Sequence, residues 1–463
     1  MIPATVKGSN LGIAGEAIAA LAIVLALFPG VFGARTWVAA AALLVAVGAI
    51  AVVARPGIPA AAVPLLAYFA VFAAAAVHGG HVSGSSGARY LLRPLLAVAI
   101  ATVPVGAAGR ARLLRVIVAA AAFEGLVAIV QCIALVVRYG GGATSRADNV
   151  TGTLGTGQAA VLAFLCLLGA AIALGPWLIG AAPSAFAATA PAVALAAGIA
   201  TSTRAVPLVV PFVGIAAAIF LFVLARRAAD MRRLALVAVI AAVYAPVSYG
   251  AIKAVYPGAF TGVVSSQNAL VLGPRQPTHP VVRKRRHATR TKPKPAQPAA
   301  PVNVGVQLLP GRFGQLRTAL RISHESGLGV LLLGRGYDST DLDPAIQDPD
   351  AVPLPERTGP TWIGRVLTEC GWLGLIAFVA LLLWLAARGV TLARARERIG
   401  PALPFLAALT AAGAVETTIL DVRAYSIPFW IVVGLAAGAP PSGYFGNLLI
   451  RSGRRRRVIA DSN

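Results

Sequence analysis

Long apolar stretches, separated by short polar segments, follow one another along most of the chain. A helix needs about 20 mainly apolar residues to cross the hydrocarbon core of a membrane. This pattern predicts an all-α polytopic membrane protein with about twelve transmembrane helices and one long extracytoplasmic loop that contains short helices. The apolar runs lie near 11–32, 37–54, 58–77, 90–107, 113–137, 158–175, 184–202, 205–225, 234–252, 371–387, 400–418 and 424–440.

Glycine and proline interrupt the apolar stretch 158–202. Gly175, Pro176 and Pro183 lie inside it, and proline ends or kinks a helix because it lacks the backbone N–H. The stretch is therefore either two spans or one broken span.

The positions of the apolar runs divide the chain into five parts. These are an N-terminal membrane bundle of about nine spans (1–252), a basic Pro-rich loop (253–305), an ordered outer loop with an amphipathic helix (306–370), C-terminal membrane spans (371–440) and a basic tail (441–463). The Pro-rich loop has no apolar periodicity, so we expect it to be disordered. Its RKRR tract at 283–286 either holds the loop against anionic lipid or glycan, or belongs to a solvated insertion.

Composition agrees with this class. Of the 463 residues, 58% are hydrophobic and 12% are charged, whereas soluble proteins carry about 25% charged residues. Cys132 and Cys166 lie inside apolar runs, which excludes a disulfide framework. The first run follows a single cation, Lys7, and precedes further spans, so we expect an uncleaved first helix rather than a signal peptide.

The distribution of basic residues predicts the orientation. The net charge is +24, but the cations lie between and after spans, which is typical of membrane topology and argues against nucleic acid as a partner. With both termini in the cytoplasm, the inner loops carry 18 cations and the short outer loops and span ends carry seven. The chain is therefore expected in the cytoplasmic membrane, with the long loop outside.

One segment of the long loop has the pattern of an amphipathic helix. Over 312–325, apolar residues recur at i, i+3 and i+7, and Arg317, Arg321 and His324 recur at i, i+4 and i+7 on another face. Such a helix suits the membrane interface, with its cations toward a phosphate headgroup, because guanidinium groups bind phosphate oxygens in pairs. The alternative is an ordinary amphipathic surface helix.

Further candidate residues lie in a turn and at a span boundary. Arg335 stands between Gly334 and Gly336, a turn in which the backbone can approach a ligand closely. The acids that follow, from Asp338 onward, have no metal-site spacing, so no metal is predicted. Arg204 lies at an outer membrane boundary between two apolar runs, where a charge is either functional or a snorkelling anchor.

Three acids fall inside predicted spans, namely Glu16, Glu124 and Glu416. A charge in a membrane span is costly unless it is paired or hydrated. We expect each of the three to pair with an arginine and support helix packing, rather than relay protons.

Several motifs, taken in order, resemble the superfamily of O-antigen ligases and O-antigen polymerases. No single motif is diagnostic, and the resemblance depends on their order and spacing. The motifs are TGTLGTGQAAVLAFL at 151–165, TSTRAVPLVV at 201–210, GRFGQLRTAL at 311–320, LLLGRGYDS at 331–339 and WIGRVLTECGWLG at 362–374.

The resemblance implies transfer or polymerisation of a glycan from a polyprenyl-pyrophosphate carrier at the outer face of the cytoplasmic membrane, without a cofactor. It implies that Arg204 and Arg312 hold the pyrophosphate, with Arg317 and Arg321 as neighbours. Arg335 is a further candidate for the same pocket. The expected partners are the lipid-linked saccharide, membrane lipids and anionic cell-envelope polymers.

The catalytic base is where the chain departs from the ligases. By the resemblance, Glu369 is a candidate catalytic residue, because it corresponds to a glutamate that ligases of the family place after a His-Asn pair. Here the positions of that pair are Pro360 and Thr361, which favours a polymerase-like or divergent member. His324 and Asp338 are then the candidates for a general base.

Two other functions use the same sequence features. A transporter or flippase for lipid-linked glycans would place the arginines in a cavity and form no covalent product. A non-catalytic membrane scaffold would use the basic loop to bind anionic polymers. The chain has no fixed-period repeat of the kind common in transporters, and the long outer loop favours the enzyme.

Overall fold

The structure is a computed structural model of the chain. It describes residues 4–28, 32–33, 35–54, 58–80, 82–140, 150–155, 158–182, 185–203, 206–225, 230–256, 327–339 and 361–439, with the single residues 320 and 324. Over these ranges every regular element is helical and no strand occurs. The predicted all-α class is confirmed.

The helices follow the predicted apolar runs, and each run contains one. The elements are α1 (Ala4–Leu27), α3 (Thr36–Ala54), the 3₁₀ turn η1 (Ala60–Ala62), α4 (Val63–Gly79), α5 (Gly84–Gly87), the π-helical turn η2 (Ala88–Leu92), α6 (Arg93–Thr102), α7 (Ala107–Tyr139), α8 (Ala159–Leu178), α9 (Ala185–Ala200), α10 (Val206–Ala225), α11 (Met231–Val255), α14 (Leu328–Leu333), α16 (Trp362–Arg394), α17 (Ala402–Glu416) and α18 (Arg423–Gly438). The stretch 158–202 is thus two helices, α8 and α9.

Seven helices in the described residues are long and apolar enough to cross a membrane. They lie within α1, α3, η1 with α4, α7, α8, α11 and α16. Four shorter apolar helices accompany them, in α9, α10, α17 and α18. The chain therefore has the structure of an α-helical membrane protein.

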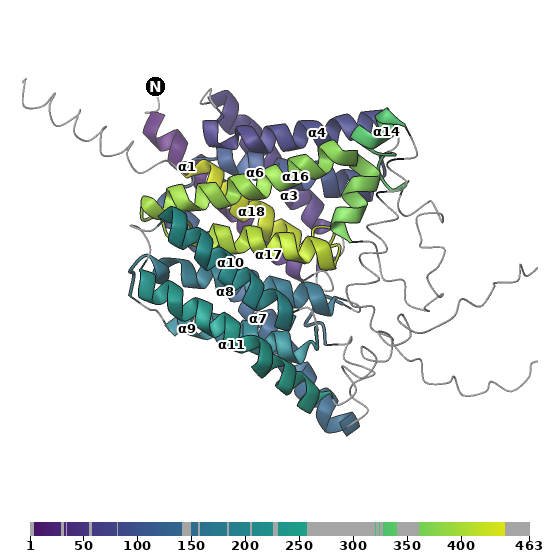
Figure 1. Cartoon of the computed structure of the whole chain (residues 1–463). Helices are drawn as coiled ribbons and strands as arrows, with labels where there is room; N and C mark the ends of the chain where they lie inside the picture. Colours follow the sequence, from purple (N-terminus) through teal and green to yellow (C-terminus); the bar gives the residue numbers. More distant parts are fainter. Residues whose placement is uncertain are drawn as a thin grey trace, which may run out of the picture.

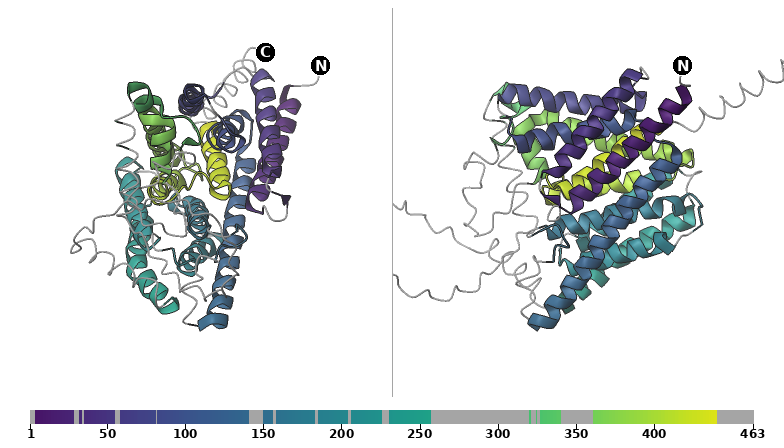
Figure 2. Two further views of the ribbon diagram at one scale, coloured as in Figure 1. Left: turned by 90° about the vertical axis from the view of Figure 1, so that its right-hand side faces the viewer. Right: turned by 180° about the vertical axis from the view of Figure 1, so that it is seen from behind.

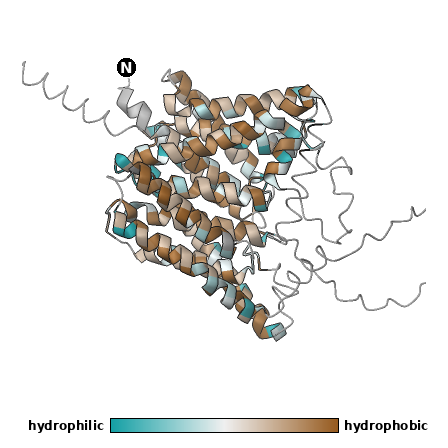
Figure 3. Cartoon of the chain, in the orientation of Figure 1, coloured by the Kyte–Doolittle hydropathy of each residue, from teal (hydrophilic) through white to brown (hydrophobic). Residues whose placement is uncertain are grey.

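The helices run between two opposite ends of the bundle (Figure 1), with α1 and α7 at a slant to the others (Figure 2). One end of the bundle contains the start of α16 and the end of α4, beside α14, and is called the Trp362 end. The opposite end contains the end of α16 and the start of α7, and is called the Arg394 end. Figure 2 shows the bundle from the Trp362 end and from behind. Hydrophobic residues dominate the length of the helices and hydrophilic ones gather toward the two ends (Figure 3).

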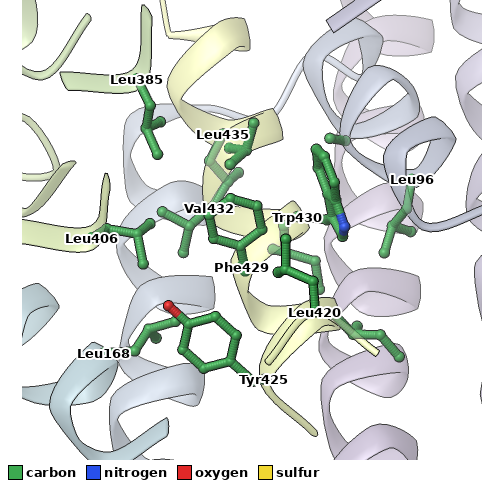
Figure 4. Packing of buried hydrophobic residues seen from close by; sticks show 14 of the residues in the cluster. Leu96, Leu168, Leu385, Leu406, Leu420, Tyr425, Phe429, Trp430, Val432 and Leu435 are labelled. Carbon is green, nitrogen blue, oxygen red and sulfur yellow. The ribbon is translucent and has the colours of Figure 1, made fainter. Parts of the chain in front are cut away.

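Helix α18 forms the centre of the core. Tyr425, Phe429, Trp430 and Val432 are almost completely buried, and Figure 4 shows them among leucines of neighbouring helices. Gly434 allows close contact with α6, because a Cβ atom there would lie 2.6 Å from the carbonyl oxygen of Ala97. Small residues that let helix backbones approach are typical of packing in membranes.

Helix α16 contains a break that separates its first turns from the long apolar part. Thr361 caps its start, its hydroxyl accepting from the N–H of Gly364 at 3.1 Å. Gly371 has φ 66° and ψ −167°, outside the helical region. The segment 362–370 is therefore a separate helical piece at the Trp362 end, ahead of the span that the sequence predicts from 371.

Several predicted segments lie outside the described residues. They are the Pro-rich loop, the tail 441–463 and the predicted helix 312–325. Of these segments the structure describes only residues 253–256, at and just after the end of α11, and the single residues 320 and 324.

Candidate functional site

The π-helical turn η2 presents two arginines at the Trp362 end. The sequence ARYLL forms the turn, and Arg93 follows as the first residue of α6, with Pro94 next. Arg93 and Tyr90 are buried, and the Arg89 side chain is only 12% exposed. Single π-helical turns are frequent at functional sites, and this one brings two guanidinium groups to the start of an apolar helix.

Glu369 lies beside this turn and is fully buried. The hydroxyl of Tyr90 donates to Glu369 Oε2 at 2.6 Å. Arg89 Nη1 lies 3.9 Å from the same oxygen, and Arg365 Nη1 lies 3.9 Å from Glu369 Oε1. Glu369 therefore faces two arginines from different helices, which offset the cost of burying its charge.

Asp421, in the connection between α17 and α18, joins the same arginines. Arg89 Nε lies 2.8 Å from Oδ1 of Asp421, and Arg365 Nε lies 3.4 Å from Oδ2. Arg93 Nη1 donates to the carbonyl oxygens of Leu420 and Asp421, at 2.7 and 2.8 Å. We call Arg89, Arg93, Arg365, Glu369 and Asp421 the Glu369 cluster.

The Gly-Arg-Gly turn packs directly on the backbone of Glu369. The N–H of Arg335 donates to the carbonyl oxygen of Thr368 at 2.8 Å, and the N–H of Gly336 donates to that of Glu369 at 3.2 Å. Gly334 has φ 78°, and a Cβ atom there would overlap the carbonyl group of Glu369. This close contact therefore requires glycine at position 334. The sequence pattern predicted a turn here, but not its contact with Glu369.

The residue after the turn extends its contacts to the aromatic core. Tyr337 is buried, and its hydroxyl donates to the carbonyl oxygen of Phe72. Its ring lies 4.6 Å from that of Tyr90, centroid to centroid. The turn is thus fixed on both sides, by α16 and by α4.

Asp338, two residues after the turn in the sequence, is 8% exposed. Burial raises the pKa of Asp338, but hydrogen bonds from Ser83 and Ser86 and the positive charge of Arg89 outweigh it, so the pKa lies below the ordinary value of 3.8. The residue is a carboxylate at neutral pH. It adopts φ 63°, a left-handed conformation that aspartate tolerates better than most residues.

The structure brings together three of the residues predicted for the site. Arg335, Asp338 and Glu369 all lie at the Trp362 end, the first with an exposed side chain and the other two buried. His324 is exposed. Arg204, Arg312, Arg317 and Arg321 lie outside the described residues.

Four members of the Glu369 cluster were not predicted as site residues. Arg89 and Arg93 lie four residues apart at the start of an apolar run, and Arg365 lies four residues before Glu369. That i, i+4 spacing places each pair on one helical face and is the signal that could have found them. Asp421 has no such signal, because its partners come from elsewhere in the chain.

The acids predicted inside spans have different partners. Glu16 pairs with Arg112, whose Nε and Nη2 lie 2.5 and 2.9 Å from the carboxylate, as expected for helix packing. Glu124 instead accepts from the N–H and hydroxyl of Thr153, at 2.8 and 2.5 Å. The prediction of an arginine partner for Glu124 is not supported, since the turn 151–153 fills that position.

The Glu369 cluster retains hydrogen-bonding capacity. Arg89 Nη1 and Arg93 Nε are buried and make no hydrogen bond within the part of the chain that the structure describes. A buried donor without a partner is costly, and a guanidinium group matches phosphate or carboxylate oxygens. The cluster holds three arginines against two acids, an excess of one positive charge.

Comparison of the chain with protein-family models, with curated proteins and with solved structures gave no match. The functional interpretation therefore depends on the residues and their geometry.

Proposed function

We propose that the protein transfers or polymerises glycan from a polyprenyl-pyrophosphate carrier at the outer face of the cytoplasmic membrane. One observation carries the proposal. Three arginines, Arg89, Arg93 and Arg365, converge at one end of an apolar helical bundle, beneath a turn that presents Arg335. A lipid-linked substrate would place its pyrophosphate at such an end and its isoprenoid chain along the apolar helices.

The chemistry fits arginine. Displacing a sugar from pyrophosphate builds negative charge on the leaving group, and positioned cations stabilise that charge as it develops. Arginine keeps its charge at every physiological pH and binds phosphate oxygens in pairs. Partial burial strengthens this effect, because the local dielectric constant is lower than that of water.

The roles of the individual residues follow from their exposure. Arg335 is exposed on a fixed turn, so we assign it to the pyrophosphate, together with Arg204, Arg312, Arg317 and Arg321 of the sequence interpretation. Glu369 is fully buried. We therefore assign Glu369 to positioning Arg89 and Arg365, in place of the catalytic role first expected of it.

The general base has two candidates that differ in environment. A base works best when its pKa lies near the working pH, and the low pKa of Asp338 makes it a weak one. His324 is exposed, and histidine is the side chain that most often serves as a general base in enzymes. Of the two, His324 is the better candidate.

We also propose that twelve helices cross the membrane, with both termini in the cytoplasm and the Trp362 end outside. The excess of cations on the predicted inner loops, 18 against seven, supports this orientation. In this orientation the Glu369 cluster lies at the outer face of the membrane. Proteins of the superfamily that the chain resembles polymerise or transfer lipid-linked glycans on that side.

The test is product formation by purified protein supplied with a polyprenyl-pyrophosphate glycan and an acceptor. Arg335→Lys keeps the charge but loses the paired hydrogen bonds, and we expect the rate to fall about tenfold. Arg204→Lys and Arg312→Lys should behave alike. Arg232→Lys, an exposed cation at the start of α11, is the control.

Two results would contradict the proposal. Near wild-type rates in all three site variants would show that these arginines do not take part in the reaction. Movement of the lipid-linked glycan across vesicles without any covalent product would identify a transporter or flippase instead.

A further inference from the structure

A second concentration of arginines lies at the Arg394 end of the bundle, away from the Glu369 cluster. The start of α7 and the connection between α16 and α17 line a cavity of about 460 Å³ there. Its charged lining residues are four arginines and one acid, namely Arg110, Arg115, Arg396, Arg398 and Glu397. The charged lining is therefore strongly positive.

One arginine of this cavity is fixed by the protein itself. Arg110 is 9% exposed. Its Nη1 donates to the carbonyl oxygen of Val105 at 2.9 Å, and its Nη2 lies 3.7 Å from Glu397 Oε2. Glu397 thus balances Arg110, and the exposed side chains of Arg115, Arg396 and Arg398 provide the excess charge.

The start of α7 adds backbone donors to the same cavity. Ala107 and Ala108 line it, and Gly106 before them provides no side-chain cap. The first N–H groups of a helix have no partner within the helix, and they carry a partial positive charge. Helix starts of this kind bind phosphate, so α7 and the arginines favour the same ligand.

The other wall is a closed turn rather than an open loop. The N–H of Arg396 donates to the carbonyl oxygen of Ala393, and that of Glu397 donates to Leu392, both at 2.9 Å. Arg396 has φ 55°, a left-handed conformation that is uncommon for arginine. Strained residues of this kind gather at binding sites.

We propose that this cavity binds the phosphate of an anionic membrane-lipid headgroup. It lies at the end of the apolar helices, where headgroups meet a membrane protein, and it combines an uncapped helix start with three exposed arginines. The same chemistry would accept a free phosphate, so the test separates the two sources. The site lies at the opposite end from the Glu369 cluster and does not depend on the proposed glycan transfer.

The experiment uses the full chain purified in detergent, with phosphatidylglycerol as the probe and native mass spectrometry to count bound lipid. Removing one cation should weaken retention about fivefold, so Arg396→Gln and Arg115→Gln should each lose bound phosphatidylglycerol. Arg232→Gln removes an exposed cation outside the cavity and should retain wild-type binding. Glu397→Gln removes the acid and should retain more lipid than wild type.

The remaining outcomes decide the assignment. If one arginine variant fails to fold, the other tests the opposite wall of the cavity. Equal retention of phosphatidylglycerol by wild type and both variants would overturn the proposal, as would equal retention of zwitterionic phosphatidylcholine by wild type. Arginine-dependent binding of inorganic phosphate, without binding of the lipid, would overturn the lipid assignment and identify a soluble phosphate compound as the ligand.

Discussion

The hydroxyl of Tyr90 donates a 2.6 Å hydrogen bond to Oε2 of Glu369, 279 positions further along the chain. Both side chains are completely buried. Together with the ion pair between Arg89 and Glu369, this contact joins the π-helical turn η2 to the first helical piece of α16.

Replacing Tyr90 by phenylalanine keeps the ring and removes that bond. A buried hydrogen bond to a charged group contributes about 1.5–3 kcal/mol, so Tyr90→Phe should lower the thermal unfolding midpoint of the purified protein. Tyr249→Phe changes a tyrosine that is 48% exposed, where water can replace a bond that the hydroxyl loses, and should have a smaller effect. Equal midpoints for the two variants would show that the bond does not stabilise the fold.

Gly80 and Gly371 both have φ above zero, but they differ in ψ, 1° and −167°, and in their surroundings. Gly80 has φ 64°, and a Cβ atom added there would meet nothing within 4 Å, whereas a Cβ atom on Gly371, φ 66°, would overlap the carbonyl group of Leu332. Gly80→Ala should cost about 1–2 kcal/mol from backbone conformation alone. Gly371→Ala should cost about 1–3 kcal/mol more, because its φ and ψ lie in a region that only glycine adopts readily and because the turn must move away from α16.

Chemical unfolding of both glycine variants measures the difference. If Gly371→Ala unfolds at the same denaturant concentration as Gly80→Ala, the close approach of the turn to α16 is wrong.

The low pKa of Asp338 predicts a dependence of stability on pH. The carboxylate stabilises the folded state above the ordinary pKa of 3.8, and this contribution is lost as the pH falls through the lower folded-state pKa. The unfolding midpoint of wild type should therefore exceed that of Asp338→Asn at neutral pH, and the gap should narrow below about pH 4.

Ser83 provides the control for this titration. Ser83→Ala removes a hydrogen bond to the carboxylate, which should raise the pKa of Asp338. In the Ser83→Ala background, the stability gap between the proteins without and with Asp338→Asn should therefore begin to close at a higher pH. A gap between wild type and Asp338→Asn that stays constant across the acid range would rule out a lowered pKa.

Cysteine labelling tests the proposed orientation. The three native cysteines, Cys132, Cys166 and Cys370, are buried, so introduced thiols report with little background. Ser85 is exposed at the Trp362 end and Ala107 is exposed at the Arg394 end. A membrane-impermeant reagent added to intact cells should label Ser85→Cys and leave Ala107→Cys unlabelled. The reverse pattern would place the Glu369 cluster in the cytoplasm.

The sequence predicts the helices well because each membrane helix satisfies its hydrogen bonds within its own segment. The local apolar run is therefore sufficient to locate α7 or α11. The break in α16 was visible only as a boundary at 371, since the carbonyl group of Leu332 that excludes a side chain at Gly371 comes from a segment 39 positions earlier.

The site was predictable only in part, for a related reason. Arg335, Asp338 and Glu369 stand in recognisable local motifs. Arg89 and Asp421 belong to the site only because they form an ion pair with each other, although 332 positions separate them in the sequence. A charge at the start of a span looks the same whether it anchors to headgroups or enters a buried cluster. Only the three-dimensional packing distinguishes the two.

The two backbone hydrogen bonds that hold the Gly-Arg-Gly turn against α16 also provide a direct way to observe the site opening. The N–H groups of Arg335 and Gly336 donate to the carbonyl oxygens of Thr368 and Glu369, so these protons exchange with solvent only when the turn separates from α16. That separation uncovers the backbone beside Glu369. Hydrogen–deuterium exchange at these two positions therefore measures the free energy of exposing the cluster from this side. A ligand that binds the closed site would slow the exchange, and one that enters beneath the turn would accelerate it.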